Sequence, residues 1–248
     1  MERVFVILAV VVNSALVCEG RFIKREREMV HGDIENLDCN GHIHATCMSN
    51  MLQYQNDFTT SSARLALLGN RQRLGGFAEA LQMLRSCVET LQSASVCAGV
   101  TDEEIGLSEL RFAAGYLSSP ARIDILHGTS GSPCLTDYRK LGQLWEDSLQ
   151  CLQNTTEAEA ESDEECAGIQ MLRECSVGVG TSVCGAGVGA FFHSLWEYSS
   201  QPNVDASELF KLIPDENLAS VMQNCNKLVP IVSLSRKKKA LRILGNFF

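Results

Sequence analysis

The chain has few of the residues that many-stranded β-structures use. Aromatic residues make up only 6% of its 248 residues, and proline occurs 5 times. A sandwich of many strands needs frequent turns, so this composition fits helices better. We therefore predict an all-α fold.

Local signatures of catalysis are also missing. The sequence contains no HExxH motif, no G-x-S-x-G elbow and no phosphate-binding P-loop. His127 lies near Ser130 and Ser132 in sequence, but proximity along the chain does not establish catalytic geometry. We predict that the protein is not an enzyme and has no catalytic residues, no cofactor and no metal site.

The body of the chain lacks a basic excess. The formal net charge is −9, and basic residues gather near the two ends, so the body is more acidic than the whole chain. Binding to a phosphate backbone requires a basic face. Nucleic acid is therefore excluded as a partner.

The apolar run at the start of the chain is short. Arg3 precedes apolar residues 4–12, and small residues follow as far as Gly20. Such a run cannot cross a bilayer core of roughly 30 Å and is typical of a signal peptide. We predict a signal peptide over 1–20, a basic N-terminal segment over 21–35, secretion into the extracellular space and no transmembrane anchor.

Cysteine, by contrast, is abundant. An even number remains after residues 1–20 are removed, which in a secreted chain indicates five disulfides. The ten are Cys39, Cys47, Cys87, Cys97, Cys134, Cys151, Cys166, Cys175, Cys184 and Cys225. Spacing does not fix the complete connectivity. We expect Cys151 to pair with Cys166, because that bond would close the acidic stretch between them and remove roughly 3 kcal/mol of unfolded-state freedom.

Apolar residues recur at helical spacing along much of the chain. Thr101 with Glu104, and Asp205 with Glu208, form capping-box patterns that mark helix starts. The helices predicted on these grounds cover 47–58, 77–96, 102–118, 135–152 and 218–228, with loops expected at 69–76 and 128–133. Together with the cysteines, this pattern predicts a disulfide-stapled helical bundle.

Two segments of the chain resemble each other. Residues 80–100 and 168–188 share QMLR, two cysteines and a trailing Gly and Val when one gap is allowed. We interpret this match as two related helical units of about 87–90 residues, at 36–125 and 126–229. Chance similarity between two amphipathic helices is the alternative.

Histidines near two cysteines suggest a zinc site, but secretion argues against one. Imidazole and thiolate groups are preferred zinc ligands. Oxidised cysteines cannot bind a metal, and histidines alone on a terminal segment would make a weak site. The residues concerned are His31, Cys39, His42, His44 and Cys47.

The most acidic part of the chain is predicted to be a loop over 154–165. It lacks the alternating ligands and closing Glu of a calcium loop, so we expect a solvated segment with at most weak contact with calcium or mineral. The sequon Asn154-Thr155-Thr156 predicts glycosylation of Asn154.

Ser176 to Trp196 contains no charged residue. A membrane span with a GxxxG pattern at Gly185 and Gly189 is one interpretation. Several glycines lower its hydrophobicity, so we favour a buried core helix entered through a glycine-rich turn.

These observations predict a secreted, non-enzymatic binding protein. Its ligand could be another extracellular protein, a small apolar molecule held between helices, or a calcium or mineral surface. One alternative is a precursor that releases a C-terminal peptide after the basic stretch 236–239, within the basic tail 230–248. Another is an acidic structural protein of the extracellular matrix.

Overall fold

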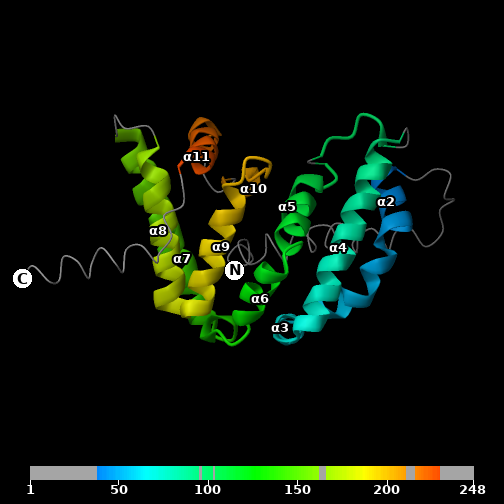
Figure 1. The fold of residues 1–248 in the computed structure, drawn as a ribbon, viewed down its shortest axis with the longest axis horizontal. Coiled ribbons are helices and arrows are strands. Elements are labelled where there is room, and N and C mark those ends of the chain that lie inside the picture. The colour runs from blue at the N-terminus through cyan, green and yellow to red at the C-terminus, as the bar shows by residue number, and fades with distance from the viewer. Residues whose placement is uncertain (1–37, 95–96, 103, 162–165, 211–215, 230–248) are drawn as a thin grey trace, which may run out of the picture.

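A computed structural model describes residues 38–94, 97–102, 104–161, 166–210 and 216–229 (Figure 1). The predicted signal peptide, the segment 21–35, His31 and the tail 230–248 lie outside this range. The α-helices are α2 (Cys39–Cys47), α3 (Ser61–Gly69), α4 (Arg71–Gln92), α5 (Leu107–Leu117), α6 (Pro120–Gly128), α7 (Tyr138–Glu161), α8 (Ala167–Cys184), α9 (Ala186–Ser199), α10 (Ser207–Phe210) and α11 (Glu216–Leu228). The described residues form no strand, which confirms the all-α prediction.

Helices gather in two groups. In Figure 1, α2 and α4 lie together on one side, with α5 beside them, and α7, α8 and α9 lie on the other side, with α10 and α11 near their ends. Helix α6 contacts both α4 and α9, so it lies between the groups. The two parts of the chain therefore meet through the short helix that follows α5.

Helix α4 confirms the clearest predicted helix and extends it at its start. Leu74, Phe77, Leu81, Leu84 and Val88 are buried along one stripe, which packs against α2 and α5. The steps of three and four between them place all five side chains on one helix face.

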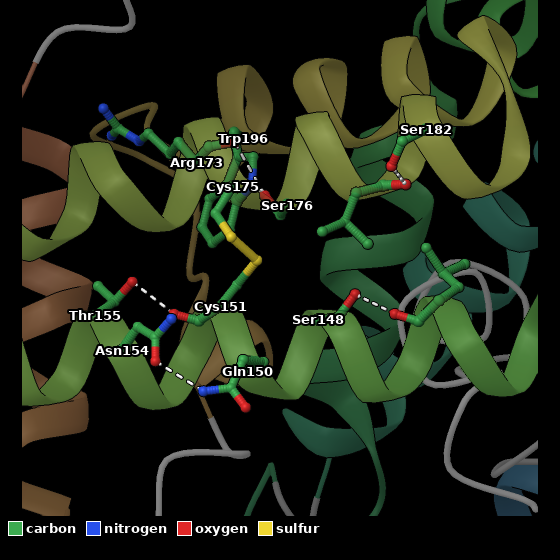
Figure 2. The surroundings of a disulfide bond; sticks show 12 residues. Ser148, Gln150, Cys151, Asn154, Thr155, Arg173, Cys175, Ser176, Ser182 and Trp196 are labelled. Atoms are coloured by element: carbon green, nitrogen blue, oxygen red, sulfur yellow. Dashed lines mark hydrogen bonds between the residues drawn. A yellow bond between two sulfur atoms is a disulfide. The ribbon is translucent and has the colours of Figure 1, made fainter.

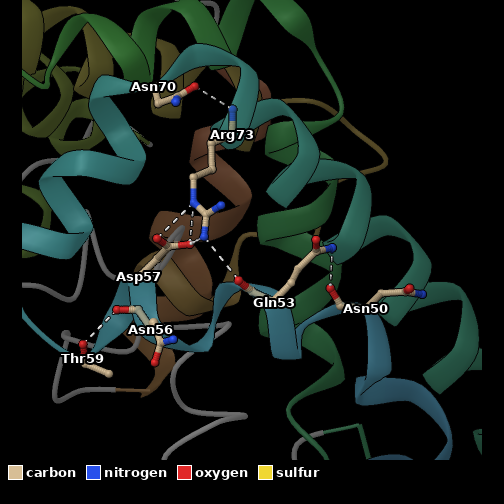
Figure 3. A network of polar contacts seen from close by, with 7 residues as sticks. All are labelled: Asn50, Gln53, Asn56, Asp57, Thr59, Asn70 and Arg73. Atoms are coloured by element: carbon tan, nitrogen blue, oxygen red, sulfur yellow. Dashed lines mark hydrogen bonds and ion pairs between the residues drawn. The ribbon is translucent and has the colours of Figure 1, made fainter.

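The predicted loop at 69–76 is wrong, because its three glycines all lie in helices, Gly69 at the end of α3 and Gly75 and Gly76 in α4. Asn70 caps α4 by accepting a hydrogen bond from the Arg73 backbone N–H at 3.0 Å (Figure 3). A Cβ on Gly76 would lie 2.6 Å from the Tyr54 hydroxyl, so glycine is required for this close approach. Gly76 therefore allows close packing of a helix, although glycine in a sequence usually indicates a turn.

The start of α5 differs from its prediction. The capping box forms, with the Thr101 backbone N–H donating to Glu104 at 2.8 Å and the Glu104 backbone N–H donating to Thr101 at 3.3 Å. Even so, α5 begins only at Leu107, because Gly106 adopts a left-handed conformation with φ +64° that ends the first turn.

The remaining predicted helices are present, but their boundaries differ from the predicted ones. The expected helix over 47–58 is built from the 3₁₀ helices η2 (Met48–Asn50) and η3 (Leu52–Phe58) after α2. The predicted helix over 135–152 is preceded by the 3₁₀ helix η5 (Pro133–Leu135) and becomes α7 at Tyr138. The last predicted helix is α11.

The uncharged stretch from Ser176 to Trp196 is not one core helix. Helix α8 ends at Cys184 and α9 begins at Ala186, and Gly185 between them has φ +93°. A residue with a Cβ rarely adopts this conformation, so the glycine sets the reversal. In the part of the chain that the structure describes, no helix is long and apolar enough to span a membrane.

The buried core runs without interruption from one helix group to the other. Tyr116 of α5 contacts Phe191 and Tyr198 of α9 in edge-to-face pairs, with ring centroids 6.0 and 5.6 Å apart. The Tyr116 hydroxyl donates to Ser194 Oγ at 3.1 Å, and burial raises the pKa of Tyr116 to about 12. The two predicted units therefore share one core.

All ten cysteines of the predicted set are paired, in the bonds Cys39–Cys97, Cys47–Cys87, Cys134–Cys184, Cys151–Cys175 and Cys166–Cys225. The expected Cys151–Cys166 bond is wrong. Residues 151–161 continue α7 as a helix, so Cys151 faces the antiparallel α8 and meets Cys175 there.

Two disulfides in each half form a nested pair, and the fifth, Cys166–Cys225, crosses both bonds of the second pair. In the first half, Cys39–Cys97 encloses Cys47–Cys87, and in the second half Cys134–Cys184 encloses Cys151–Cys175. The cysteines in the matched segments keep their places in this nesting, with Cys87 and Cys175 in the inner bonds and Cys97 and Cys184 in the outer bonds. The relation between the two units stays a prediction.

Candidate ligand-binding pocket

A pocket opens between α7, α8, α9 and α10, within the second helix group. Most of its ten lining side chains are apolar, and none carries a titratable group. They are Trp145, Ser148, Leu149, Leu152, Leu172, Ser176, Phe192, Leu195, Trp196 and Leu209. Both tryptophans of the chain belong to this set.

The pocket has a buried wall and a partly exposed rim. Helices α8 and α9 supply the buried wall, of which Leu172, Phe192 and Leu195 are members. Trp145 and Leu209 are part-exposed, as are the other lining residues of α7, so the pocket opens to solvent beside them. A ligand would enter from the α7 and α10 side and meet the wall formed by α8 and α9.

The cavity has a volume of about 60 Å³. One water needs roughly 10–15 Å³ of such space, and an engineered cavity that holds benzene measures about 150 Å³. The cavity therefore admits a chain end or a ring edge, with the rest of a larger ligand lying across the rim.

Two glycines allow the wall to form. A Cβ on Gly180 of α8 would lie 2.5 Å from the ring of Phe192, so the ring takes its place over bare backbone. A Cβ on Gly189 of α9 would lie 2.0 Å from Thr181 Oγ1. The small residues let α8 and α9 approach closely, and that approach positions Phe192 and Trp196 on the pocket side.

The polar atoms of the wall are hydrogen-bonded (Figure 2). Trp196 Nε1 donates to Ser176 Oγ at 2.7 Å, and Ser176 Oγ donates to the Arg173 carbonyl at 3.1 Å. Ser148 Oγ on α7 donates to the Leu144 carbonyl at 2.6 Å. The indole of Trp196 is thus held in one orientation by a buried serine.

The Cys151–Cys175 disulfide joins α7 to α8 close to the lining residues Ser148 and Ser176 (Figure 2). Ser148 and Leu172 lie three residues before Cys151 and Cys175 on α7 and α8, and Leu152 and Ser176 directly follow these cysteines. This bond fixes the distance between the two helices that face each other across the pocket.

Arg173 of α8 forms hydrogen bonds that hold α11 against this wall. Its guanidinium donates to the Asn226 backbone carbonyl at 2.6 Å, to Asn226 Oδ1 at 3.0 Å and to the Val229 carbonyl at 2.8 Å. Burial lowers the pKa of Arg173 to about 10. These acceptors lie at the C-terminal end of α11, where carbonyls lack helical partners and a cation is stabilised by the helix dipole.

The histidine cluster predicted as a weak zinc candidate supplies no thiolates. Cys39 and Cys47 are bonded to Cys97 and Cys87. His42 and His44 lie on α2, and among the described residues no group of three or more His, Cys, Asp or Glu side chains is arranged to hold a metal ion.

The acidic stretch predicted as a loop over 154–165 is helical as far as Glu161, as part of α7, and 162–165 lie outside the described residues. Asn154 is exposed on α7, and its Oδ1 accepts a hydrogen bond from Gln150 Nε2 at 2.8 Å. Thr155, which belongs to the sequon, is buried and donates to the Cys151 carbonyl at 2.7 Å. Glycosylation of Asn154 stays a prediction.

His127 and Ser132 each contact a backbone carbonyl of another segment. His127 Nδ1 lies 2.6 Å from the Leu68 carbonyl, and Ser132 Oγ donates to the Cys184 carbonyl at 2.7 Å. Both side chains therefore make contacts with backbone that join separate segments of the fold.

Sequence reasoning found one side of the pocket only. Trp145, Leu149 and Leu152 belong to the apolar stripe predicted over 135–152. Ser176 and Leu209 carried no signal, because a serine in an apolar stretch and an isolated leucine are common in cores and loops alike.

Comparisons with protein-family models, curated proteins and solved structures give no match to this chain.

Proposed function

We propose that this protein is a secreted binding protein that holds the end of a small apolar ligand in the pocket between α7, α8, α9 and α10. The observation that carries the proposal is the lining itself: apolar walls with two hydroxyls, open on one side, in a helix group cross-linked by disulfides. Binding sites for small molecules have this composition.

The lining favours binding over catalysis. General acid–base and nucleophilic chemistry needs a titratable or activated group at the reacting atom. The described pocket residues include two serines, whose hydroxyl protons bond to helix carbonyls, and no histidine, carboxylate or lysine. Five disulfides suit a protein that works outside the cell, where bonds of this kind persist.

The test is a titration of the purified, oxidised protein with the neutral probe N-phenyl-1-naphthylamine. Trp145 and Trp196 are the only tryptophans and both line the pocket, so energy transfer from them reports binding at this site. We expect saturable transfer together with a rise in probe emission.

Matched substitutions identify the site. Leu149→Phe adds bulk at the rim and should weaken probe binding at least tenfold, while Leu52→Phe, at a leucine 53% exposed on η3, should leave it unchanged. Equal binding by both variants, or no saturable binding by the unmodified protein, would contradict the proposal.

A further inference from the structure

Resting on this proposed function, we infer that the ligand brings an uncharged hydrogen-bond donor, such as an alcohol hydroxyl, into the pocket, and that carboxylates are rejected. Ser148 and Ser176 are the two hydroxyl-bearing residues of the lining, one on each side of the pocket. The donors and acceptors that these two hydroxyls leave free decide which polar group a bound ligand can carry.

Both serines have already used their single donor. A serine hydroxyl has one O–H donor and two acceptor lone pairs. The Ser148 proton goes to the Leu144 carbonyl at 2.6 Å and the Ser176 proton to the Arg173 carbonyl at 3.1 Å. Each serine oxygen can therefore accept a hydrogen bond from a bound ligand, but neither hydroxyl can donate one to it.

The orientation of Ser176 is held by a second bond. Trp196 Nε1–H is a buried donor, and it bonds to Ser176 Oγ at 2.7 Å. Leaving a buried donor unpaired is costly. A ligand that accepted the Ser176 proton would have to break the bond to Arg173 while the oxygen still received the indole proton, whereas a ligand that donates uses the remaining lone pair.

Charge on the ligand would find no partner in this pocket. The ten lining residues carry no cationic side chain. The nearby guanidinium of Arg173 directs its N–H groups to Asn226 and Val229 on the α11 side. A carboxylate would lose its hydration without a compensating ion pair or donor, which excludes it from an apolar site.

The test compares three ligands of nearly equal size: n-octanol, heptyl methyl ether and octanoate. None absorbs where tryptophan does, so the emission of Trp145 and Trp196 can be followed directly. We expect n-octanol to bind roughly 3- to 10-fold more tightly than the ether, as one neutral hydrogen bond allows, and octanoate to bind most weakly.

Serine variants assign the preference. Ser148→Ala and Ser176→Ala should each reduce the ratio of n-octanol to ether affinity, because the ether affinity of the same variant accounts for any change in the pocket itself. Ser93→Ala is the matched control, because Ser93 Oγ also donates to a carbonyl of its own helix, at 2.7 Å, but lies at the end of α4. Circular dichroism of each variant checks that the helices persist.

Each outcome separates this inference from the proposed function. Equal affinity for alcohol and ether, or tightest binding of octanoate, would overturn the donor preference while the pocket itself stands. A preference that survives in both serine variants would also overturn it. Failure of every ligand and of N-phenyl-1-naphthylamine to bind would instead overturn the proposed function.

Discussion

Arg173 is a charged residue with 4% of its surface exposed, and its described partners are carbonyl and amide oxygens. A guanidinium can satisfy several acceptors at once because its donors are fixed in a planar fork. An ammonium group carries its three donors on one nitrogen, so it cannot reach the same set of acceptors. The fold therefore requires arginine at this position, whereas the sequence analysis identified it only as part of the QMLR match.

We expect Arg173→Lys to lower the free energy of unfolding by about 1–3 kcal/mol, because buried oxygens of Asn226 and Val229 lose their donors. Urea denaturation of the oxidised protein measures the change. Arg139→Lys, at an exposed position of α7, should stay within about 0.5 kcal/mol of the unmodified protein. Equal effects of the two substitutions would argue against a specific role of the guanidinium.

Glu89 of α4 gives stability a dependence on pH. Arg111 donates to its carboxylate at 2.8 Å and lowers the pKa of Glu89 below its ordinary 4.5. Since the folded-state pKa lies below the unfolded value, the contribution is fully present above pH 4.5 and is lost as pH falls through the folded value.

Arg111→Ala should therefore reduce the loss of stability between neutral and acidic pH. The variant is expected to be less stable at pH near 7 and to approach the unmodified protein near pH 3, as followed by urea midpoints. A constant difference at both pH values would show that Arg111 acts through packing and not through the charge of Glu89.

At the scale of elements, small residues decide how α8 and α9 meet. Gly189 faces Thr181 so closely that a methyl group would lie 2.0 Å from Thr181 Oγ1. Gly178, on the same pair of helices, has open space around its Cα. Two glycines of identical helix propensity thus have opposite expected responses.

Gly189→Ala should destabilise the protein by roughly 1–3 kcal/mol through overpacking. Gly178→Ala should be neutral or stabilise by up to about 1 kcal/mol, because alanine has the higher helix propensity. Thermal denaturation of the two variants provides the comparison. Combining Gly189→Ala with Thr181→Ala should recover part of the loss, and the absence of any recovery would count against this contact.

The disulfide between α7 and α8 is expected to support the proposed pocket, unlike the Cys47–Cys87 bond of the first helix group. Replacing Cys151 and Cys175 by alanine should weaken N-phenyl-1-naphthylamine binding, because the facing helices can then separate. Replacing Cys47 and Cys87 removes a bond of the first helix group and should lower stability, by roughly 2–4 kcal/mol, without changing probe affinity. Equal probe affinity in both double variants would contradict this assignment.

For the molecule as a whole, the continuous core predicts cooperative unfolding of the two helix groups. Tyr116, whose side chain is fully buried, joins α5 to α9 through two ring contacts and the bond to Ser194. Its loss would remove two of the three ring contacts described between α5 and α9 and leave only Phe112–Tyr198, while each group retains its own nested disulfides.

Calorimetry of the oxidised protein should accordingly show one transition. Tyr116→Ala is expected to cost about 3–5 kcal/mol and to split the transition in two, while Tyr138→Ala, at a residue 70% exposed, should preserve a single transition. Two transitions in the unmodified protein would show that the groups unfold independently.

Much of the fold followed from sequence because its signals are local. The apolar stripe from Phe77 to Leu91 predicts α4, since a face of that spacing has to be buried. The even number of cysteines predicts that all are paired. The predicted loop at 69–76 is wrong because glycine also occurs inside helices: the contact with Tyr54 explains Gly76, whereas Gly69 and Gly75 have open space around them.

The sequence by itself determined the helical class and the apolar faces of α4, α7 and α11. It also determined that every cysteine of the predicted set forms a disulfide, though not with which partner. The tertiary structure decided which cysteines meet, where the uncharged stretch turns back at Gly185, and which side chains of four helices line one pocket. Helix formation and burial depend on neighbours a few residues apart, whereas disulfide partners and pocket walls depend on how distant helices approach.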